Sequence, residues 1–247
     1  MTYKLTIAYD GTRYKGWQRL KNNPLTIQQK LEEVISRIFN EPIELIGSGR
    51  TDGGVHALGQ VASFSSEKVF ELNRLLKEIN RYLPEDISIK HVESAAPRFH
   101  ARFNAIKKTY TYQVWTSEIP PVFERLYVHQ IHDGSLELNR MKKASEYFVG
   151  KHDFRGFTTD KTKKSTTRNI ERIDFVQDGP ILKIIFVGDG FLYNMIRILV
   201  GTLLEVGLGT RDVDSILKVY ESGDRSLAGE TAPAKGLFLT EVFYENY

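Results

Sequence analysis

The strongest constraint on the fold is a hydrophobic period that changes repeatedly along the chain. Apolar residues at every second position, as between Tyr3 and Tyr9, are typical of a strand with one buried face. Apolar residues at helical spacing follow, behind a capping-box pattern made by Thr26 and Gln29. Pro42 ends this helix, and residues 43–46 are predicted to form a short strand. The alternation of the two periods indicates an α+β protein.

The same succession of elements occurs twice. In the first half, strands are predicted at 3–9, 43–46, 60–64 and from 87 onward, and helices at 27–38 and 72–83. In the second half, strands are predicted at 109–115, 170–176, 181–187 and 237–244, and helices at 141–148, 191–206 and 213–220. Apart from the short last helix, both halves have the order βαββαβ, which resembles a ferredoxin-like unit. We therefore expect two α+β halves, residues 1–105 and 106–247, whose sheets join into one extended mixed or antiparallel sheet around a central cleft.

Composition narrows the class of protein. The hydrophobic content of 41% and the charged content of 26% are ordinary for a globular chain, so most of the sequence is expected to be ordered. The absence of cysteine excludes disulfides, thiolate metal ligands and a cysteine nucleophile, and it suits a reducing compartment. No apolar run is long enough to span a bilayer, and no long apolar segment follows a basic start. We expect a cytoplasmic protein.

Two basic runs stand out although the formal net charge is only +3. Residues 98–108 interleave cations with rings, namely Arg98, Arg102, Lys107 and Lys108 with Phe99, His100 and Phe103. Residues 161–168 contain no apolar side chain and carry Lys161, Lys163, Lys164 and Arg168. Phosphates need cations, and unpaired bases stack on aromatic or guanidinium faces, so the two runs favour RNA as a partner. A solvated strand edge and a solvated loop are the alternative for either run taken alone.

The stretch GSGRTDGGVHA, residues 47–57, indicates a shaped loop, because its glycines permit unusual backbone angles and close approach of another molecule. A phosphate cradle is disfavoured, because Asp52 stands where a glycine is needed and would repel phosphate. A metal site could use Asp52 and His56, but no further ligand is near, and the loose pair of His129 and His132 is more typical of surface histidines. A carboxylate acting as nucleophile or base is the favoured use, with Asp52 as the candidate.

Such a carboxylate must be ionised and aimed, and it therefore needs a cationic partner. Arg50 is too close in the sequence to guarantee a pair with Asp52. Arg197 lies in an otherwise apolar predicted helix, where an unpaired charge is unfavourable. It is therefore a candidate partner, although Glu205 or Asp189 could equally pair with it in a structural role.

Several blocks of sequence together resemble one family. They are GRTDGGVHA, RFHARFNAIKKTYTY, GDGFLYNMIRILVGTLLEVG and TAPAKGLFLTEVFYE, and GTRYKGWQRL near the start fits as well. Their order is similar to that of the tRNA pseudouridine synthase A family, and the resemblance covers essentially the whole chain. One departure is Gly53, where the family most often has alanine. The resemblance implies two ferredoxin-like halves joined in one sheet with a central catalytic cleft, and a homodimer.

The resemblance also implies an activity and a site. Enzymes of the family isomerise uridine to pseudouridine in tRNA, typically at nucleotides 38 to 40 of the anticodon arm. Asp52 matches the catalytic aspartate, and Arg197 matches the arginine that pairs with it. Tyr110 matches the tyrosine that stacks on the target base, and Arg50 matches the arginine that helps to flip the nucleotide out.

The chemistry of pseudouridine formation sets further expectations. The reaction breaks the bond from C1′ to N1 and joins C1′ to C5 without net redox change, so no cofactor is expected. The candidate phosphate-binding residues of the tRNA site are Arg98, Arg102, Lys107 and Lys108. Two other functions stay open from the residues alone: a noncatalytic RNA-binding module, and a metal-dependent nuclease or hydrolase. A paralogue of the family with a different uridine site preference is a further alternative.

Overall fold

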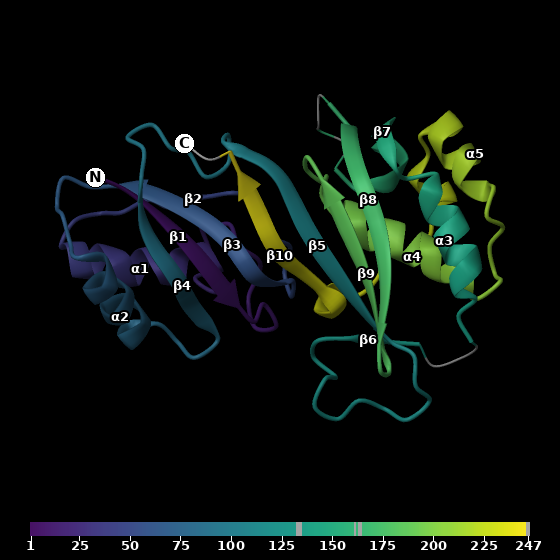
Figure 1. Cartoon of the computed structure of the whole chain (residues 1–247), viewed down its shortest axis with the longest axis horizontal. Coiled ribbons are helices and arrows are strands. Elements are labelled where there is room, and N and C mark those ends of the chain that lie inside the picture. The colour runs from purple at the N-terminus through teal and green to yellow at the C-terminus, as the bar shows by residue number, and fades with distance from the viewer. Residues whose placement is uncertain (132–134, 161, 163–164, 246–247) are drawn as a thin grey trace. The chain divides into compact units, whose positions relative to one another are not determined.

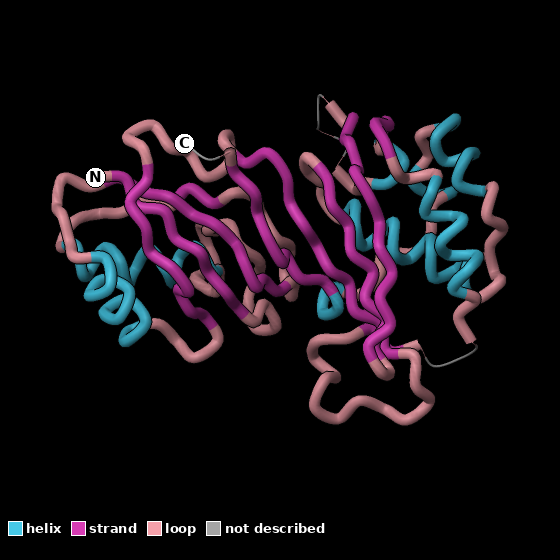
Figure 2. Tube along the Cα trace, viewed as in Figure 1, coloured by secondary structure: helices cyan, strands magenta, loops and turns pink. Residues whose placement is uncertain are grey.

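The structure is a computed structural model of the whole chain, and it describes residues 1–131, 135–160, 162 and 165–245. The chain divides into two compact units (Figure 1). The first unit contains Met1–Lys108 and Phe238–Tyr247, and the second contains Thr109–Leu237. In both units, helices pack against a sheet (Figure 2). No helix among the described residues has the length and apolarity to cross a membrane.

The first unit has the predicted order of elements. It contains β1 (Thr2–Tyr9), α1 (Ile27–Phe39), β2 (Ile46–Gly47), β3 (His56–Ser65), α2 (Leu72–Tyr82) and β4 (Ile87–Ala95). Strand β1 lies between β4 and β3 and is antiparallel to both. Strand β2 pairs antiparallel with the later part of β3, and β10 (Leu237–Tyr244) pairs parallel with the start of β3. The order β4-β1-β3-β2 is that of a ferredoxin-like sheet.

Local sequence explains these elements. The alternating residues of β1 bury one face, and Tyr3 stacks on Phe64 of β3 with ring centroids 4.9 Å apart. Helix α1 begins where the Thr26 hydroxyl accepts a hydrogen bond from the Gln29 N–H, as the capping box predicts. It ends at Asn40, which adopts the left-handed conformation two residues before the predicted end at Pro42.

The second unit repeats the scheme with additional elements. Its main elements are β5 (Ala105–Trp115), α3 (Leu138–Glu146), β8 (Thr167–Asp178), β9 (Ile181–Gly188), α4 (Met195–Gly207) and α5 (Ser215–Ser222). The smaller ones are β6 (His129–Gln130), β7 (Gly150–Asp153), and the 3₁₀ turns η1 (Arg155–Phe157), η2 (Arg225–Leu227) and η3 (Ala234–Gly236). The strand order is β5-β9-β8-β7, and β6 pairs parallel with β5. Strands β8 and β9 form the predicted antiparallel pair.

The α+β fold with two similar halves is confirmed, and a few details differ. The predicted halves were divided at residue 105, whereas the compact units divide between Lys108 and Thr109 and return most of β10 to the first unit. That return follows from the parallel pairing of β10 with β3. Helix α4 begins at Met195 rather than at 191, because Asn194 has a φ of 58° and breaks the helical path. The central cleft stays a prediction.

Candidate active site

Asp52 lies in the loop that joins β2 to β3, and we call residues 48–55 the aspartate loop. The side chain is half-buried. A tight turn follows it, in which the Val55 N–H donates to the Asp52 carbonyl at 3.2 Å and Gly54 has a φ of 77°. The loop therefore has a defined path on the C-terminal side of the carboxylate.

Buried groups fix the residue that precedes Asp52. The Thr51 hydroxyl forms a hydrogen bond of 2.8 Å with the Tyr9 hydroxyl, and both residues are buried. The Thr51 carbonyl accepts the Trp17 N–H at 3.0 Å. Burial raises the pKa of the Tyr9 phenol, so this hydroxyl stays neutral and available for hydrogen bonding at physiological pH. Hydrogen bonds to Tyr9 and Trp17 thus fix the backbone next to Asp52.

A second set of contacts holds the beginning of the aspartate loop. The Ser48 hydroxyl donates to the Gln60 side-chain oxygen at 2.7 Å, and the Gln60 amide donates to the Gly49 carbonyl at 3.1 Å. The Lys108 ammonium donates to the Ser48 carbonyl at 2.7 Å. We call Tyr9, Ser48, Gln60 and Lys108 the loop support. Because Ser48 and Gln60 are fully buried, their bonds are shielded from water.

Arg50 differs from its neighbours in being exposed. Its Nε donates to the Gln18 side-chain oxygen at 3.1 Å. The guanidinium therefore lies at the surface of the same loop that carries Asp52, where it can reach a bound molecule.

Two glycines near Asp52 have opposite tolerance for a side chain. Gly16 has a φ of 98°, and a Cβ there would lie 2.5 Å from the Thr51 carbonyl oxygen. Gly53 has no positive φ, and its nearest contact to an added Cβ would be an ordinary 3.6 Å. The family's usual alanine at position 53 would therefore fit here.

We expect Gly16→Ala to lower the free energy of unfolding by roughly 1–3 kcal/mol, because the added methyl strains the backbone and pushes against Thr51. Gly53→Ala is the matched control and should change the free energy by no more than about 1 kcal/mol, in the stabilising direction. Urea unfolding of both variants measures the difference. Equal losses of stability would show that the contact of Gly16 with the aspartate loop is not needed.

His56, considered above as a metal ligand, has structural contacts. Its Nδ1 accepts the Gly11 N–H at 3.1 Å and lies 3.1 Å from an Asp10 carboxylate oxygen, and its ring stacks on Phe238. Among residues 1–131, 135–160, 162 and 165–245, no group of three or more His, Asp or Glu side chains could hold a metal ion. His132, one member of the other histidine pair, lies outside the described residues.

Arg197 lies in the first turn of α4, in the second unit, and is half-buried. Its Nε donates to the Ala232 carbonyl at 2.6 Å, and its Nη1 donates to the Asn194 side-chain oxygen at 3.0 Å. The Ala232 N–H in turn donates to the Arg197 carbonyl at 3.1 Å. The direction of the guanidinium is therefore fixed by backbone and side-chain acceptors.

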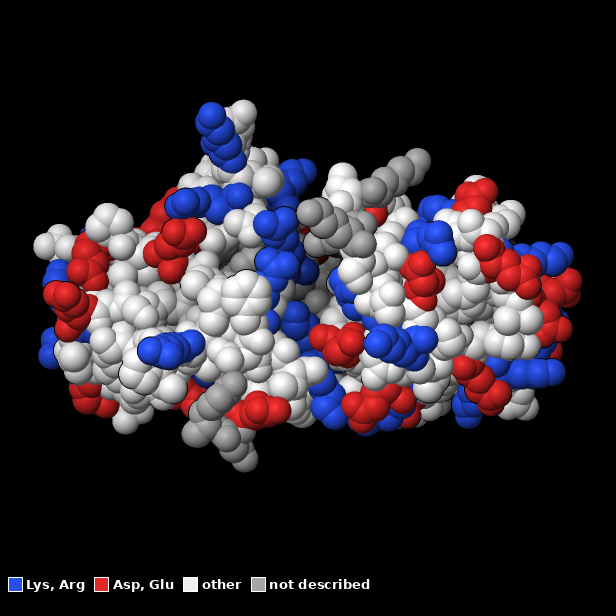
Figure 3. Space-filling view, turned by 90° about the horizontal axis from the view of Figure 1, so that it is seen from above, with Lys and Arg blue, Asp and Glu red and all other residues white. Residues whose placement is uncertain are grey.

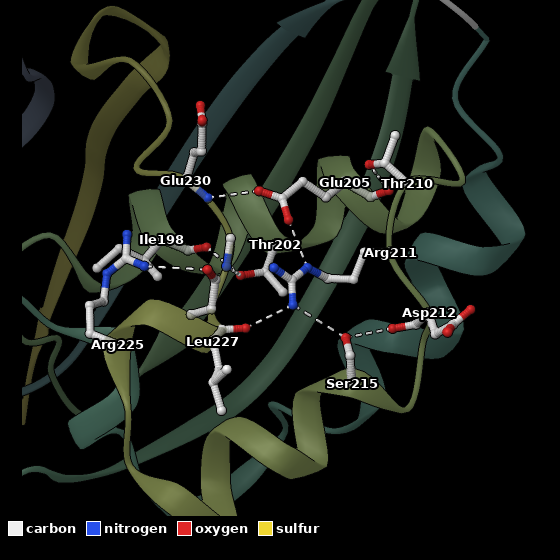
Figure 4. Close-up of polar contacts among 12 residues, drawn as sticks. Ile198, Thr202, Glu205, Thr210, Arg211, Asp212, Ser215, Arg225, Leu227 and Glu230 are labelled. Atoms are coloured by element: carbon white, nitrogen blue, oxygen red, sulfur yellow. Dashed lines mark hydrogen bonds and ion pairs between the residues drawn. The ribbon is translucent and has the colours of Figure 1, made fainter.

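The two carboxylates considered as structural partners of Arg197 are engaged elsewhere. Glu205 accepts from Arg211 Nε at 2.7 Å and from the Glu230 N–H at 2.8 Å (Figure 4). Asp189 accepts the Asn169 N–H at 3.0 Å. The structural contacts of Arg197 that the structure describes are therefore those with Ala232 and Asn194.

The segment that carries Ala232 is held tightly on α4, and we call residues 228–233 the strap. The Gly229 N–H donates to the Thr202 hydroxyl at 2.9 Å, next to the Glu205 contact seen in Figure 4. A Cβ on Gly201 of α4 would lie only 1.8 Å from the Glu230 carbonyl oxygen. Glycine at 201 thus permits the close approach that brings Ala232 to Arg197.

Tyr110 lies on β5 and is only 8% exposed. Its ring meets the Phe191 ring edge to face, with centroids 5.4 Å apart, which fixes the orientation of the tyrosine. Two residues further along, the Tyr112 hydroxyl donates to the Pro233 carbonyl at 2.9 Å and so supports the end of the strap.

The basic residues of 98–108 differ in their exposure to solvent. Arg98 and Arg102 are exposed in the turn between β4 and β5, whereas Lys107 and Lys108 are half-buried on β5. On the face shown in Figure 3, lysine and arginine gather in one band, and elsewhere the two signs of charge are interspersed. In the other run, Arg168 is at the start of β8, and Lys161, Lys163 and Lys164 lie outside the described residues.

Comparison with known proteins decides the family. A sequence profile described as tRNA pseudouridine synthase matches residues 5–104 and 144–245, which is more than half of the chain. The chain belongs to this family. A tRNA pseudouridine synthase A of Bacillus sp. (strain KSM-64) is 49% identical over 98% of this chain and 99% of the relative. Another, from Clostridium kluyveri, is 43% identical over 98% of both chains.

The resemblance inferred from the motifs is therefore confirmed, and the chain is an isomerase of the tRNA pseudouridine synthase A family, which modifies uridines in tRNA. The alternative of a noncatalytic RNA-binding module is not supported by this membership.

The predicted site residues are divided between the two units. Asp52, Arg50 and Lys108 belong to the first unit, and Tyr110 and Arg197 belong to the second. The pairing of Asp52 with Arg197 stays a prediction. Sequence reasoning missed the loop support and the strap. A polar Gln60 inside an apolar strand pattern was the available signal for the loop support, and Gly201 on the apolar helix was the signal for the strap.

Proposed function

We propose that this enzyme converts uridine to pseudouridine at nucleotides 38 to 40 of the anticodon arm of tRNA, with the Asp52 carboxylate as the catalytic group. The observation that carries the proposal is the aspartate loop itself. It holds one half-buried carboxylate on a backbone fixed by buried hydrogen bonds at Ser48 and Thr51, as a group that must be aimed at a reacting atom requires.

The reaction suits a carboxylate. The bond from C1′ to N1 breaks, the uracil rotates, and a bond from C1′ to C5 forms while the hydrogen on C5 leaves as a proton. Asp52 can assist by adding to the base or the sugar, or by deprotonating the sugar. Arg197 is proposed as the cation that keeps Asp52 ionised and oriented through charge-assisted hydrogen bonds.

The target base must leave its stack before it can react, at a cost of about a few kcal/mol. We propose that Arg50 occupies the vacated place, because its guanidinium is exposed on the same loop as Asp52. Tyr110 is proposed to stack on the displaced uracil, with its orientation set by Phe191. These two contacts recover part of the cost of displacement.

The remaining parts of the proposal concern binding and assembly. We propose that Arg98, Arg102, Lys107 and Lys108 contact tRNA phosphates, with Lys108 also holding the Ser48 carbonyl. The enzyme is proposed to act as a homodimer, as the family resemblance implies, and to be cytoplasmic, as expected from its composition. Light scattering of the purified chain tests the dimer.

Tritium release from tRNA labelled at uridine C5 tests the function, because joining C1′ to C5 must expel that hydrogen. We expect release by the purified enzyme in the presence of a metal chelator, at a rate equal to that without chelator. Unlabelled tRNA with the same sequence serves as competitor and should reduce the release. Release that depends on added metal would contradict the mechanism proposed for Asp52.

A further inference from the structure

The turn that joins β4 to β5, residues 96–104, is held by several hydrogen bonds, both within itself and to neighbouring strands (Figure 1). The Asn104 N–H donates to the His100 carbonyl at 3.0 Å, and the His100 N–H donates to the Asn104 side-chain oxygen at 2.7 Å. Ala101 is fully buried, and its N–H donates to the Ser63 hydroxyl at 3.1 Å. The Tyr244 hydroxyl donates to the Ala101 carbonyl at 2.7 Å. The turn is thus fastened to β3 and β10.

This rigid turn presents an aromatic ring to solvent. Phe103 is 78% exposed, and one face of its ring lies on the His100 ring with centroids 4.1 Å apart and an interplanar angle of 24°. His100 is itself fixed, because its Nδ1 accepts the N–H groups of Arg102 and Phe103, both at 3.2 Å. The phenyl ring therefore has a set orientation with an accessible surface.

The charges on this segment of the chain indicate which kind of molecule can bind against the Phe103 ring. Arg98 and Arg102 are exposed on the same turn, and the chain has no Asp or Glu between Glu93 and Glu118. A protein partner would be favoured by an extended apolar surface, whereas a lone ring flanked by cations matches a base with its neighbouring phosphates.

We infer that the stacked pair of His100 and Phe103 is a platform for an unpaired base of the tRNA, distinct from the reacting uridine at Asp52. The inference rests on the proposed binding of tRNA by residues 98–108 and does not depend on which uridine is modified. The Phe103 ring stacks on the base, and Arg98 and Arg102 hold the adjoining phosphates. The platform adds affinity without taking part in bond breaking.

Binding of an unlabelled tRNA transcript to the full-length chain tests the platform. Phe103→Ala should weaken binding by roughly 5- to 150-fold, the range of one base stacked on an aromatic ring. Phe103→Leu should weaken it similarly, because leucine is apolar but has no π face, and Phe103→Trp should bind as the wild type does. Each variant should keep the wild-type melting temperature, since the side chain is largely exposed.

Salt dependence separates stacking from charge. Removal of the ring should leave the slope of log Kd against log salt unchanged, whereas Arg102→Met, the matched control, should reduce it by about 0.7–0.9. Binding of Phe103→Ala within twofold of the wild type would overturn the inference. So would wild-type binding by Phe103→Leu, or a change in oligomeric state of Phe103→Ala at unchanged tRNA affinity.

The outcome is separable from that of the proposed function. Failure of the proposed function would appear as missing tritium release by the wild type. Failure of the platform would leave that release intact and the binding of Phe103→Ala unchanged.

Discussion

Asp52→Asn is expected to reduce tritium release from C5-labelled tRNA by roughly 10⁴-fold or more. The amide keeps the shape of the side chain but can neither act as a nucleophile nor accept a proton. Binding of tRNA should change little, because the phosphate contacts are proposed to come from other residues. Release is measured under single-turnover conditions with saturating enzyme, so that the measured rate reports the chemical step and not the affinity for tRNA.

The control for Asp52→Asn removes the same charge at a surface position. Asp174 is half-buried on β8 and pairs with Arg172 at 2.9 Å, in the second unit. Asp174→Asn should release tritium at the wild-type rate. If Asp52→Asn retained more than about a hundredth of the wild-type rate, the carboxylate would not be the catalytic group.

Arg197→Lys is expected to lower kcat by about 100-fold with little change in KM. Lysine keeps the positive charge, but it lacks the planar fork with which arginine bonds Ala232 and Asn194 while directing its remaining N–H groups elsewhere. Arg197→Met should lower kcat further, because it also removes the charge that is proposed to orient Asp52. Steady-state kinetics on unmodified tRNA gives both constants.

A structural role for Arg197 predicts a different pattern. If its only task were to hold the strap, both variants would lose similar stability, and kcat would follow the folded fraction. Melting temperatures therefore accompany the kinetics, and Thr202→Val provides a comparison that weakens the strap through the Gly229 contact without touching the guanidinium. Loss of kcat by Thr202→Val equal to that of Arg197→Met would contradict the pairing with Asp52.

Much of the fold could be predicted because local patterns agree with tertiary packing. The alternation in β1 and the cap at Thr26 act within a few residues, and the structure places both where the sequence indicates. The start of α4 could not be predicted in this way. The apolar spacing from Phe191 onward continues through Asn194, which has a left-handed conformation and whose side chain donates to Thr159, 35 residues away in the sequence.

The candidate site could likewise be predicted only in part from the sequence. Asp52 and Arg50 could be selected because chemically active residues in a glycine-rich stretch are unusual, and Arg197 because it is a charged residue in an otherwise apolar helix. Gln60 and Gly201 gave a signal for the groups that hold them, but the contacts of Lys108 and Ala232 could not be predicted. Lys108 reaches the aspartate loop from β5, which is distant in the sequence. The Ala232 carbonyl is a backbone group to which residue type gives no clue.

Asp52 is proposed to carry out the isomerisation at nucleotides 38 to 40. The most direct test of this proposal maps pseudouridine at nucleotide resolution in one tRNA transcript after incubation with the wild type and with Asp52→Asn. We expect pseudouridine at those nucleotides with the wild type, one for each tritium released, and none with Asp52→Asn. Pseudouridine formed by Asp52→Asn, or formed by the wild type only outside nucleotides 38 to 40, would contradict the proposal.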